Sequence, residues 1–440
     1  MVIRTFPQSY PDEWGTGEEG SELGEGALAA SAASAASAVG PRPGGSSRPL
    51  TAVVLAAGEG TRMKSARPKP LHRLCGRPMV LHVLDALAEL SVTRVVVVVG
   101  HRAEWVTKTL IEHAPAGMAI EFVEQAEQHG TGDAMSVALT GLPDDEGDEE
   151  SDVVVLPGDT PLLRPTTLAR LVRAHRDSEA AATLLTAELD DPSGYGRVVR
   201  GRNDSVARVV EHGDATEEEL EVKEINTSIY CFRRSVLAPS LRRLSPANAQ
   251  GEYYLTDVVE VLYEAGHNVG SMVVMDTMEV AGVNDRAQLA IAEAELRDRI
   301  NERWMRRGVT MWDPERTYID ADVRLATDVV LLPGVILQGA CEIAEHAEIG
   351  PNSHLVDTAV GEGAVVMDSV CRRSVIGPDA RIGPFAVLAE GSEVAAGAVV
   401  GAAGVVVSGP GPEADAGSGV GPADVGVDPE PADVGVDPAR

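Results

Sequence analysis

The first stretch whose residues could bind phosphate is TAVVLAAGEGTRM, residues 51–63, in which an apolar run opens onto two glycines. A dinucleotide-binding fingerprint would need a third glycine where Met63 stands, and a P-loop would need Gly-Lys-Ser/Thr after Gly60, where Thr61 and Arg62 follow. What remains is a strand, a loop whose glycines let backbone N–H groups approach an anion, and a cation beside that loop. An ordinary turn has a similar composition, so the loop alone leaves both interpretations open.

A second cation follows in RPKPLH, where Lys69 stands between Pro68 and Pro70. Prolines restrict the backbone, so this lysine is well placed to meet a charged oxygen near the loop. The alternative is an exposed lysine in a turn. A carboxylate, Asp159, ends the apolar run VVVLPGD and is a candidate metal ligand at the end of a strand.

The elements that must position these residues alternate between strands and helices. Apolar runs at TAVVLAA, RVVVVVG, VVVLPGD and SMVVM are separated by helical patterns such as PMVLHVLDALAEL and GDAMSVALTGL. Continuous apolar strands alternating with helices predict a Rossmann-like α/β domain with a mostly parallel sheet covered on both faces. In such sheets ligands bind beyond the carboxyl ends of the strands, where the glycine loop and Asp159 are both expected.

A six-residue period follows a helix-like segment that runs from Asp285 to about Arg307. From Ile376 the chain reads IGPDAR, IGPFAV, LAEGSE, VAAGAV and VGAAGV, and less regular hexads run back towards Val323. This repeat predicts a short left-handed parallel β-helix of about four or five coils. Because such prisms commonly associate, we expect a homotrimer through this domain.

Composition excludes some partners. The formal net charge of -31 argues against a nucleic-acid surface or an anionic membrane as the main partner. No apolar stretch approaches the roughly 20 residues of a membrane span. Four cysteines without a CxxC motif fit a reduced, cytoplasmic chain. An acidic protein that handles nucleotide phosphates must concentrate its cations locally or use a metal.

The motifs together resemble the sugar-nucleotide pyrophosphorylases, whose signature has the form L-x-x-G-x-G-T-R followed by P-K. Within that class the chain resembles the bifunctional N-acetylglucosamine-1-phosphate uridylyltransferases of bacterial cell-wall precursor synthesis, from about Thr51 to about Ala396. Further motifs occur in the order of that family: VEQAEQHGTGDA, PGDTPLL, DPSGYGRVVR, VEHGDAT, EINTSIY, NAQGEYYLTD and GVNDRAQL.

This resemblance implies roles by position. Arg62, Lys69 and Asp159 are expected to be catalytic, and Asp159 and Asn284 to hold Mg²⁺. The nucleotide is expected along Leu55, Ala56, Ala57, Gly58, Pro157 and Gly158, with Gln125, Gly130 and Thr131 recognising uracil. The sugar is expected near Gly196, Glu211, Asn226 and Asn284, with Tyr254 and Thr256 as weaker candidates. The Gln125 amide suits the uracil edge because an amide offers both a donor and an acceptor.

The implied reaction is attack by a sugar 1-phosphate oxygen on the α-phosphorus of UTP, in line with departing pyrophosphate. The protein then positions two anions and neutralises their charge, with Arg62 at the triphosphate end and Lys69 near the α-phosphate and the sugar phosphate. No general base is required, because a phosphate monoester is already ionised near neutral pH.

Two departures from the family pattern stand out. Glu59 places a carboxylate in the phosphate loop, and Val387 and Ala389 replace basic residues that the family has after IGPFA. The family continues the β-helix further and acetylates glucosamine 1-phosphate there, so we expect uridylyl transfer without acetyl transfer. The expected organisation is a disordered extension (1–49), a nucleotidyltransferase domain (50–284), a linker helix region (285–313), a truncated β-helix (314–407) and a disordered acidic tail (408–440).

Two other functions stay open from the sequence. The same fold and chemistry would serve a nucleotidyltransferase that uses dTTP or CTP with another hexose 1-phosphate. A regulatory scaffold without catalytic activity would keep the sheet and the β-helix. In such a protein, substitutions should first accumulate at the catalytic positions, yet Arg62, Lys69, Asp159 and Asn284 are all present here.

Overall fold

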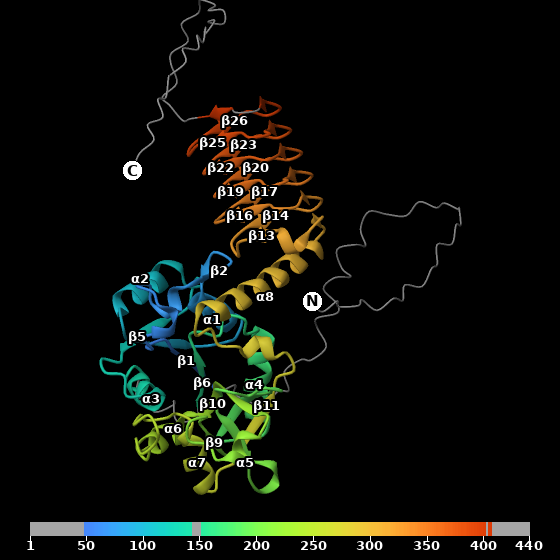
Figure 1. Cartoon of the computed structure of the whole chain (residues 1–440). Helices are drawn as coiled ribbons and strands as arrows, with labels where there is room; N and C mark the ends of the chain where they lie inside the picture. Colours follow the sequence, from blue (N-terminus) through green and yellow to red (C-terminus); the bar gives the residue numbers. More distant parts are fainter. Residues whose placement is uncertain (1–47, 143–150, 402–403, 407–440) are drawn as a thin grey trace, which may run out of the picture. The chain divides into compact units, whose positions relative to one another are not determined.

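A computed structural model describes residues 48–142, 151–401 and 404–406 (Figure 1). The disordered ends expected from the sequence lie almost entirely outside these residues. Within them the structure has an α/β region followed by a β-helix, which confirms the predicted fold class.

A mixed sheet forms the α/β region. The strand order is β11 (Val269–Val273), β7 (Ala182–Glu188), β10 (Glu224–Arg233), β6 (Asp152–Pro157), β1 (Leu50–Leu55), β4 (Arg94–Val99) and β5 (Ile120–Glu124). β1 is parallel to both of its neighbours, β6 and β4. β10 is antiparallel to β6 and β7, so the sheet is parallel in its β5, β4, β1 and β6 half. β8 (Arg197–Arg200) and β9 (Val206–Val210) pair beside β10.

Helices cover both faces of this sheet. Successive residues of a strand point to opposite faces, so a strand that is apolar throughout needs a covering layer on each side. In β1, Ala52 and Val54 belong to one buried cluster and Val53 to the other. The first cluster includes residues of α1 (Met79–Ala88), α2 (Ala103–His113) and α4 (Pro165–Asp177). The second includes residues of α3 (Thr131–Thr140), α6 (Arg234–Leu241) and α7 (Asp257–Glu264).

The pairing register of β1 places the loops that follow β1 and β6 next to each other. Leu55, the last residue of β1, lies opposite Val98 of β4 and Pro157 of β6. The chain after β1 continues to β4 on one side, whereas β6 lies on the other, so the loops that follow β1 and β6 open a crevice at this switch point.

The β-helix begins at β12 (Thr310–Met311) and contains five complete three-strand coils and two strands of a sixth in the described residues. The second residue of most strands is buried, as at Leu331, Leu337 and Ile343. One sheet contains β12 (Thr310–Met311), β15 (Val330–Leu331), β18 (Glu348–Ile349), β21 (Val365–Val366), β24 (Arg381–Ile382) and β27 (Val399–Val400). The second contains β13 (Tyr318–Ile319), β16 (Ile336–Gln338), β19 (His354–Val356), β22 (Val370–Arg372), β25 (Val387–Leu388) and β28 (Val405–Val406). The third contains β14 (Arg324–Leu325), β17 (Glu342–Ile343), β20 (Ala359–Val360), β23 (Val375–Ile376) and β26 (Glu393–Val394).

Helix α8 (Arg286–Met305) joins the two regions. The Asp285 carboxylate caps its first turn by accepting from the backbone N–H groups of Ala287 and Gln288 at 2.9 and 2.8 Å. Ile300 and Trp304, near its other end, belong to the buried cluster of the β-helix.

All four cysteines are buried, and none of them forms a disulfide bond. Among the helices in the described part of the chain, none has the length and apolar character needed to cross a membrane.

Candidate active site

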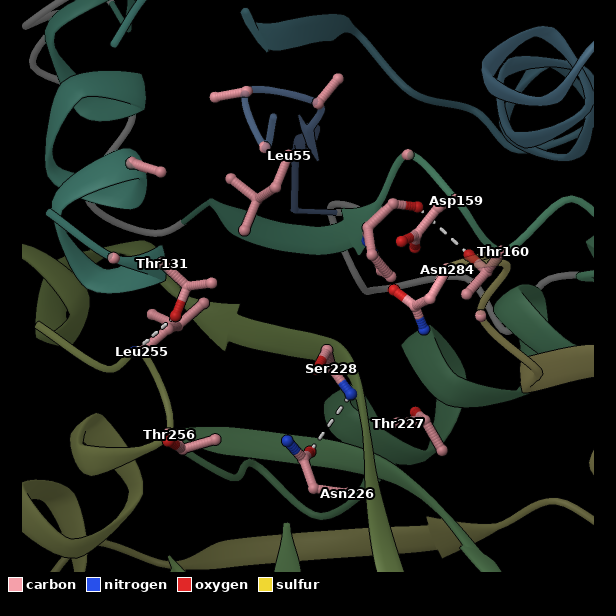
Figure 2. Close-up of a pocket in the computed structure, with 18 of the residues that line it drawn as sticks. Leu55, Thr131, Asp159, Thr160, Asn226, Thr227, Ser228, Leu255, Thr256 and Asn284 are labelled. Carbon is pink, nitrogen blue, oxygen red and sulfur yellow. Dashed lines mark hydrogen bonds between the residues drawn. The ribbon is translucent and has the colours of Figure 1, made fainter. Parts of the chain in front are cut away.

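The candidate site is a cavity of about 500 Å³ at the carboxyl ends of β1 and β6 (Figure 2). Its lining includes the loops after β1 and β6, the segment between β5 and the start of α3, part of β10, and the chain just before α7 and α8. Fifteen of the eighteen residues proposed from the sequence are among those lining it: Leu55, Ala56, Ala57, Gly58, Lys69, Gln125, Gly130, Thr131, Pro157, Gly158, Asp159, Glu211, Asn226, Thr256 and Asn284.

The glycine loop is fixed to the sheet and to Lys69. The Ala56 N–H donates to the Val98 carbonyl at 2.9 Å, which continues the β1–β4 ladder into the loop. Gly60 has φ +64°, and a Cβ added there would lie 2.5 Å from the Cβ of Lys69. A side chain at this position would therefore be strained and would displace the lysine.

Lys69 lies at the centre of the charged end of the cavity. It begins a short 3₁₀ segment (Lys69–Leu71) after Pro68, and its side chain is 14% exposed. Its ammonium group forms an ion pair with the Asp159 carboxylate and donates to the Asn284 Oδ1 at 2.7 Å. The Arg62 guanidinium donates to the same Asn284 oxygen at 2.9 Å. Two cations, one carboxylate and one amide thus meet beside the glycine loop.

Two oxygen-bearing side chains could hold a divalent cation here. Asp159 and Asn284 lie close together (Figure 2), and a Cβ added at Gly282 would be 3.8 Å from both Asp159 Oδ1 and Asn284 Nδ2. The described residues contain no group of three or more His, Cys, Asp or Glu side chains suited to a metal. A site of two protein oxygens completed by phosphate and water is the type that Mg²⁺ occupies beside a substrate. The donor chemistry therefore fits Mg²⁺.

The far side of the cavity is polar and partly enclosed. Glu211 is half-buried, accepts a hydrogen bond from the Thr256 hydroxyl at 3.2 Å, and has a raised pKa because burial disfavours its charge. Asn226 is also buried, and its Nδ2 donates to the Tyr230 hydroxyl at 2.8 Å. Its Oδ1 accepts from the Ser228 N–H at 3.3 Å, at a bulge in β10 (Figure 2). The bulge brings Thr227 and Ser228 into the lining.

Three proposed residues lie outside the residues that line the cavity. Arg62 contacts the lining residue Asn284 through its guanidinium group. Gly196 supports the lining residue Asn226, whose backbone N–H donates to the Gly196 carbonyl at 2.9 Å. Tyr254 is buried, and its neighbour Leu255 lines the cavity instead.

The sequence analysis also missed residues that contribute to the cavity. Gln128, in the same segment as Gln125, lines it and donates its Nε2 to the Ala57 carbonyl at 2.7 Å, which ties this segment to the glycine loop. A second glutamine three residues after Gln125 is visible in the motif, but only the fold shows that it reaches the glycine loop.

The mixed sheet, the glycine loop and the cations beside it are those of a nucleotidyltransferase. A family profile described as a MobA-like NTP transferase domain matches residues 52–265. The bifunctional protein GlmU of Streptomyces avermitilis is 48% identical over 355 residues, which cover 80% of this chain and 72% of that protein. The bifunctional protein GlmU of Thermobifida fusca is 50% identical over 333 residues, covering 76% of this chain and 68% of that protein. That of Exiguobacterium sibiricum is 46% identical over 350 residues, covering 80% and 76%. This chain belongs to the bifunctional GlmU family, and it is a nucleotidyltransferase.

Proposed function

We propose that the protein binds UTP and N-acetylglucosamine 1-phosphate in this cavity and converts them to UDP-N-acetylglucosamine and pyrophosphate. The observation that carries this proposal is the meeting of Arg62, Lys69, Asp159 and Asn284 at the open end of the glycine loop, in a chain of the GlmU family. These groups can gather two anionic substrates, which is the main task of a protein that catalyses phosphoryl transfer.

In the proposed step, an oxygen of the sugar phosphate forms a bond to the α-phosphorus of UTP. The bond from that phosphorus to the oxygen bridging to the β-phosphate breaks, and pyrophosphate leaves with the electron pair. Lys69 neutralises charge near the α-phosphate, and Arg62 neutralises charge on the triphosphate end. No side chain has to remove a proton, because the attacking phosphate is already ionised near neutral pH.

Mg²⁺ is proposed to bind between Asp159 and Asn284, and it supplies further neutralisation of the phosphate oxygens when bound. Both protein ligands also contact Lys69, so the lysine and the metal share partners. This sharing couples the position of the lysine to the occupancy of the metal site.

The sugar is proposed to lie against the enclosed polar side of the cavity. Glu211 and Thr256 form one hydrogen-bonded pair there, and Asn226 is fixed by its own strand. Side chains held by neighbours lose little conformational entropy when they bind a ligand, so they favour one orientation of the sugar.

A homotrimer through the β-helix is also proposed, because prisms built of stacked coils commonly associate into symmetric oligomers. Light scattering of the purified chain should give three times the mass of the monomer. A monomer would refute this part of the proposal.

One experiment tests the reaction itself. Pyrophosphate release is measured with UTP, dTTP and CTP, each against a panel of sugar 1-phosphates that includes the N-acetylglucosamine and glucose forms. We expect the highest kcat/KM for UTP with N-acetylglucosamine 1-phosphate. A strong preference for dTTP or for glucose 1-phosphate would overturn the proposal and favour the alternative nucleotidyltransferase. No turnover with any pair would favour the regulatory scaffold.

A further inference from the structure

Within the described part of the chain, the side-chain amide of Gln125 is hydrogen-bonded through its nitrogen only. Gln125 follows β5, is 5% exposed and lines the cavity. Its Nε2 donates to Asp133 Oδ2 at 2.7 Å and to the Gly130 carbonyl at 3.1 Å. Its backbone N–H donates to the Val99 carbonyl at 2.8 Å, so the backbone of the residue is fixed as well.

Both partners of this amide nitrogen are acceptors. A carboxylate and a backbone carbonyl have no proton to donate, and a primary amide has two N–H groups. The nitrogen of Gln125 must therefore face Asp133 and Gly130, which settles the orientation that amides usually leave to interpretation. Since both N–H groups are used, only the carbonyl oxygen Oε1 is available to a ligand. The expectation that this amide offers a donor and an acceptor together is thus narrowed to an acceptor alone.

An acceptor alone distinguishes uracil from cytosine. Uracil presents an N–H group at position 3, between two carbonyl oxygens, whereas cytosine presents an unprotonated nitrogen there. Gln125 Oε1 can accept from the uracil N–H but is repelled by the lone pair of the cytosine nitrogen. A site built around one hydrogen bond rejects a ligand that leaves its polar group unpaired.

We infer that Asp133 is a positioning residue that makes the site select uracil, by fixing the Gln125 amide with its oxygen available to the base. The inference rests on the proposed binding of UTP in this cavity. Asp133 is half-buried and is not among the residues that line the cavity, so it acts through Gln125.

The start of α3 is held tightly enough for this role. Gly130 has φ +105°, and a Cβ added there would lie 2.5 Å from the Tyr253 carbonyl oxygen. The Gly132 N–H donates to that same oxygen at 2.7 Å, and the Leu255 N–H donates to the Thr131 hydroxyl at 3.0 Å. The first turn of α3 therefore keeps Asp133 at a constant distance from the base side of the cavity.

A different role for Asp133 would be purely structural, because an acidic side chain in the first turn stabilises a helix. Two substitutions separate the roles. Asp133→Ala removes both the charge and the acceptor, whereas Asp133→Asn removes the charge but keeps an oxygen that can accept from Gln125. A helix-stabilising role predicts similar effects from both, and a positioning role predicts a larger effect from alanine. Glu104→Ala, which removes an exposed acid from the first turn of α2, is the matched control.

The test compares UTP with CTP in the whole chain, by calorimetric binding and by turnover with N-acetylglucosamine 1-phosphate. We expect the wild type to prefer UTP and the ratio of UTP to CTP to fall by about tenfold in Asp133→Ala, the effect of losing one oriented hydrogen bond. Asp133→Asn should keep most of the ratio, and Glu104→Ala should leave it unchanged. Thermal unfolding checks each variant, and Asp133→Leu, of similar shape, replaces Asp133→Ala if the latter does not fold.

Two results would overturn the inference: an unchanged ratio in a folded Asp133→Ala or Asp133→Leu, or a wild type that binds CTP as tightly as UTP. Failure of the proposed function looks different. If UTP is selected but another sugar phosphate is used, the proposed sugar is wrong and the role of Asp133 stands.

Discussion

Replacing Lys69 with alanine is the most direct perturbation of the proposed chemistry. The Lys69 ammonium group contacts both Asp159 and Asn284 beside the glycine loop, and the side chain is largely enclosed. Its removal takes one positive charge from the place where we propose that the α-phosphate binds. The backbone should tolerate the change, because the prolines on either side remain.

The expected magnitude follows from the charge and its surroundings. A unit charge about 4 Å from a phosphate oxygen contributes about 4 kcal/mol at an effective dielectric constant of about 20. Part of this attraction already acts on the bound substrates and does not accelerate the reaction. If about 2.7 kcal/mol acts only in the transition state, turnover falls by about 10²-fold.

Steady-state pyrophosphate release with UTP and N-acetylglucosamine 1-phosphate measures this loss. The matched control is Lys108→Ala, which removes an equal charge from the exposed face of α2, where its side chain is 76% exposed. Thermal unfolding of both variants shows whether each is folded. Near-wild-type kcat in a folded Lys69→Ala variant would mean that the lysine does not act on the transition state and that the proposed mechanism is wrong.

Four further outcomes are expected. Gly60→Ala should lower kcat at least about tenfold by displacing Lys69, whereas Gly117→Ala, which also has positive φ but no atom within 4 Å of the added Cβ, should leave kcat unchanged. Burial, and secondarily the Glu260 carboxylate, raises the pKa of Asp257 from 3.8 to about 6. The folded state then holds that proton more tightly than the unfolded state, so this residue lowers the free energy of unfolding as pH rises from about 4 to about 6. Asp257→Asn should reduce this pH dependence of the free energy of unfolding, as measured by urea denaturation. EDTA should abolish activity and Mg²⁺ restore it; full activity in chelator would remove both proposed metal ligands from that role. With acetyl-CoA and glucosamine 1-phosphate, free thiol should not appear; enzyme-dependent release at the rate of uridylyl transfer would show acetyl transfer after all.

The β-helix shows which part of the fold the sequence could predict. The buried residues Ile376, Ile382, Leu388 and Val394 recur at six-residue intervals, and this regular stretch made the repeat visible. Further upstream the interval between buried residues shortens to five, as from Leu355 to Val360. The strands of successive coils still pair in parallel despite this shorter interval. A search for a strict six-residue repeat therefore misses these coils, although they have the same fold.

The site shows a similar division. Glycines and charges at strand ends were visible as local patterns, since parallel strands bring their carboxyl ends to one edge. The contacts between them were not, because Lys69 is 90 residues from Asp159 and 215 from Asn284. The sequence also could not choose between adjacent residues: the weaker candidate Tyr254 is buried away from the cavity, and Leu255 lines it.

The arrangement of Arg62 and Lys69 explains how so acidic a chain can bind phosphates. Both cations donate to the single Oδ1 atom of Asn284, and only Lys69 is also paired with Asp159. Two positive charges and one negative charge leave one net positive charge at this end of the cavity, in a chain whose formal net charge is -31. The field of the whole molecule repels nucleotides at long range, but that repulsion is screened beyond about 8–10 Å at physiological ionic strength. Recognition must therefore come from charge at contact distance. Because a neutral amide oxygen competes weakly with phosphate for two cations, the contacts of Arg62 and Lys69 with Asn284 can be exchanged for contacts with the substrate.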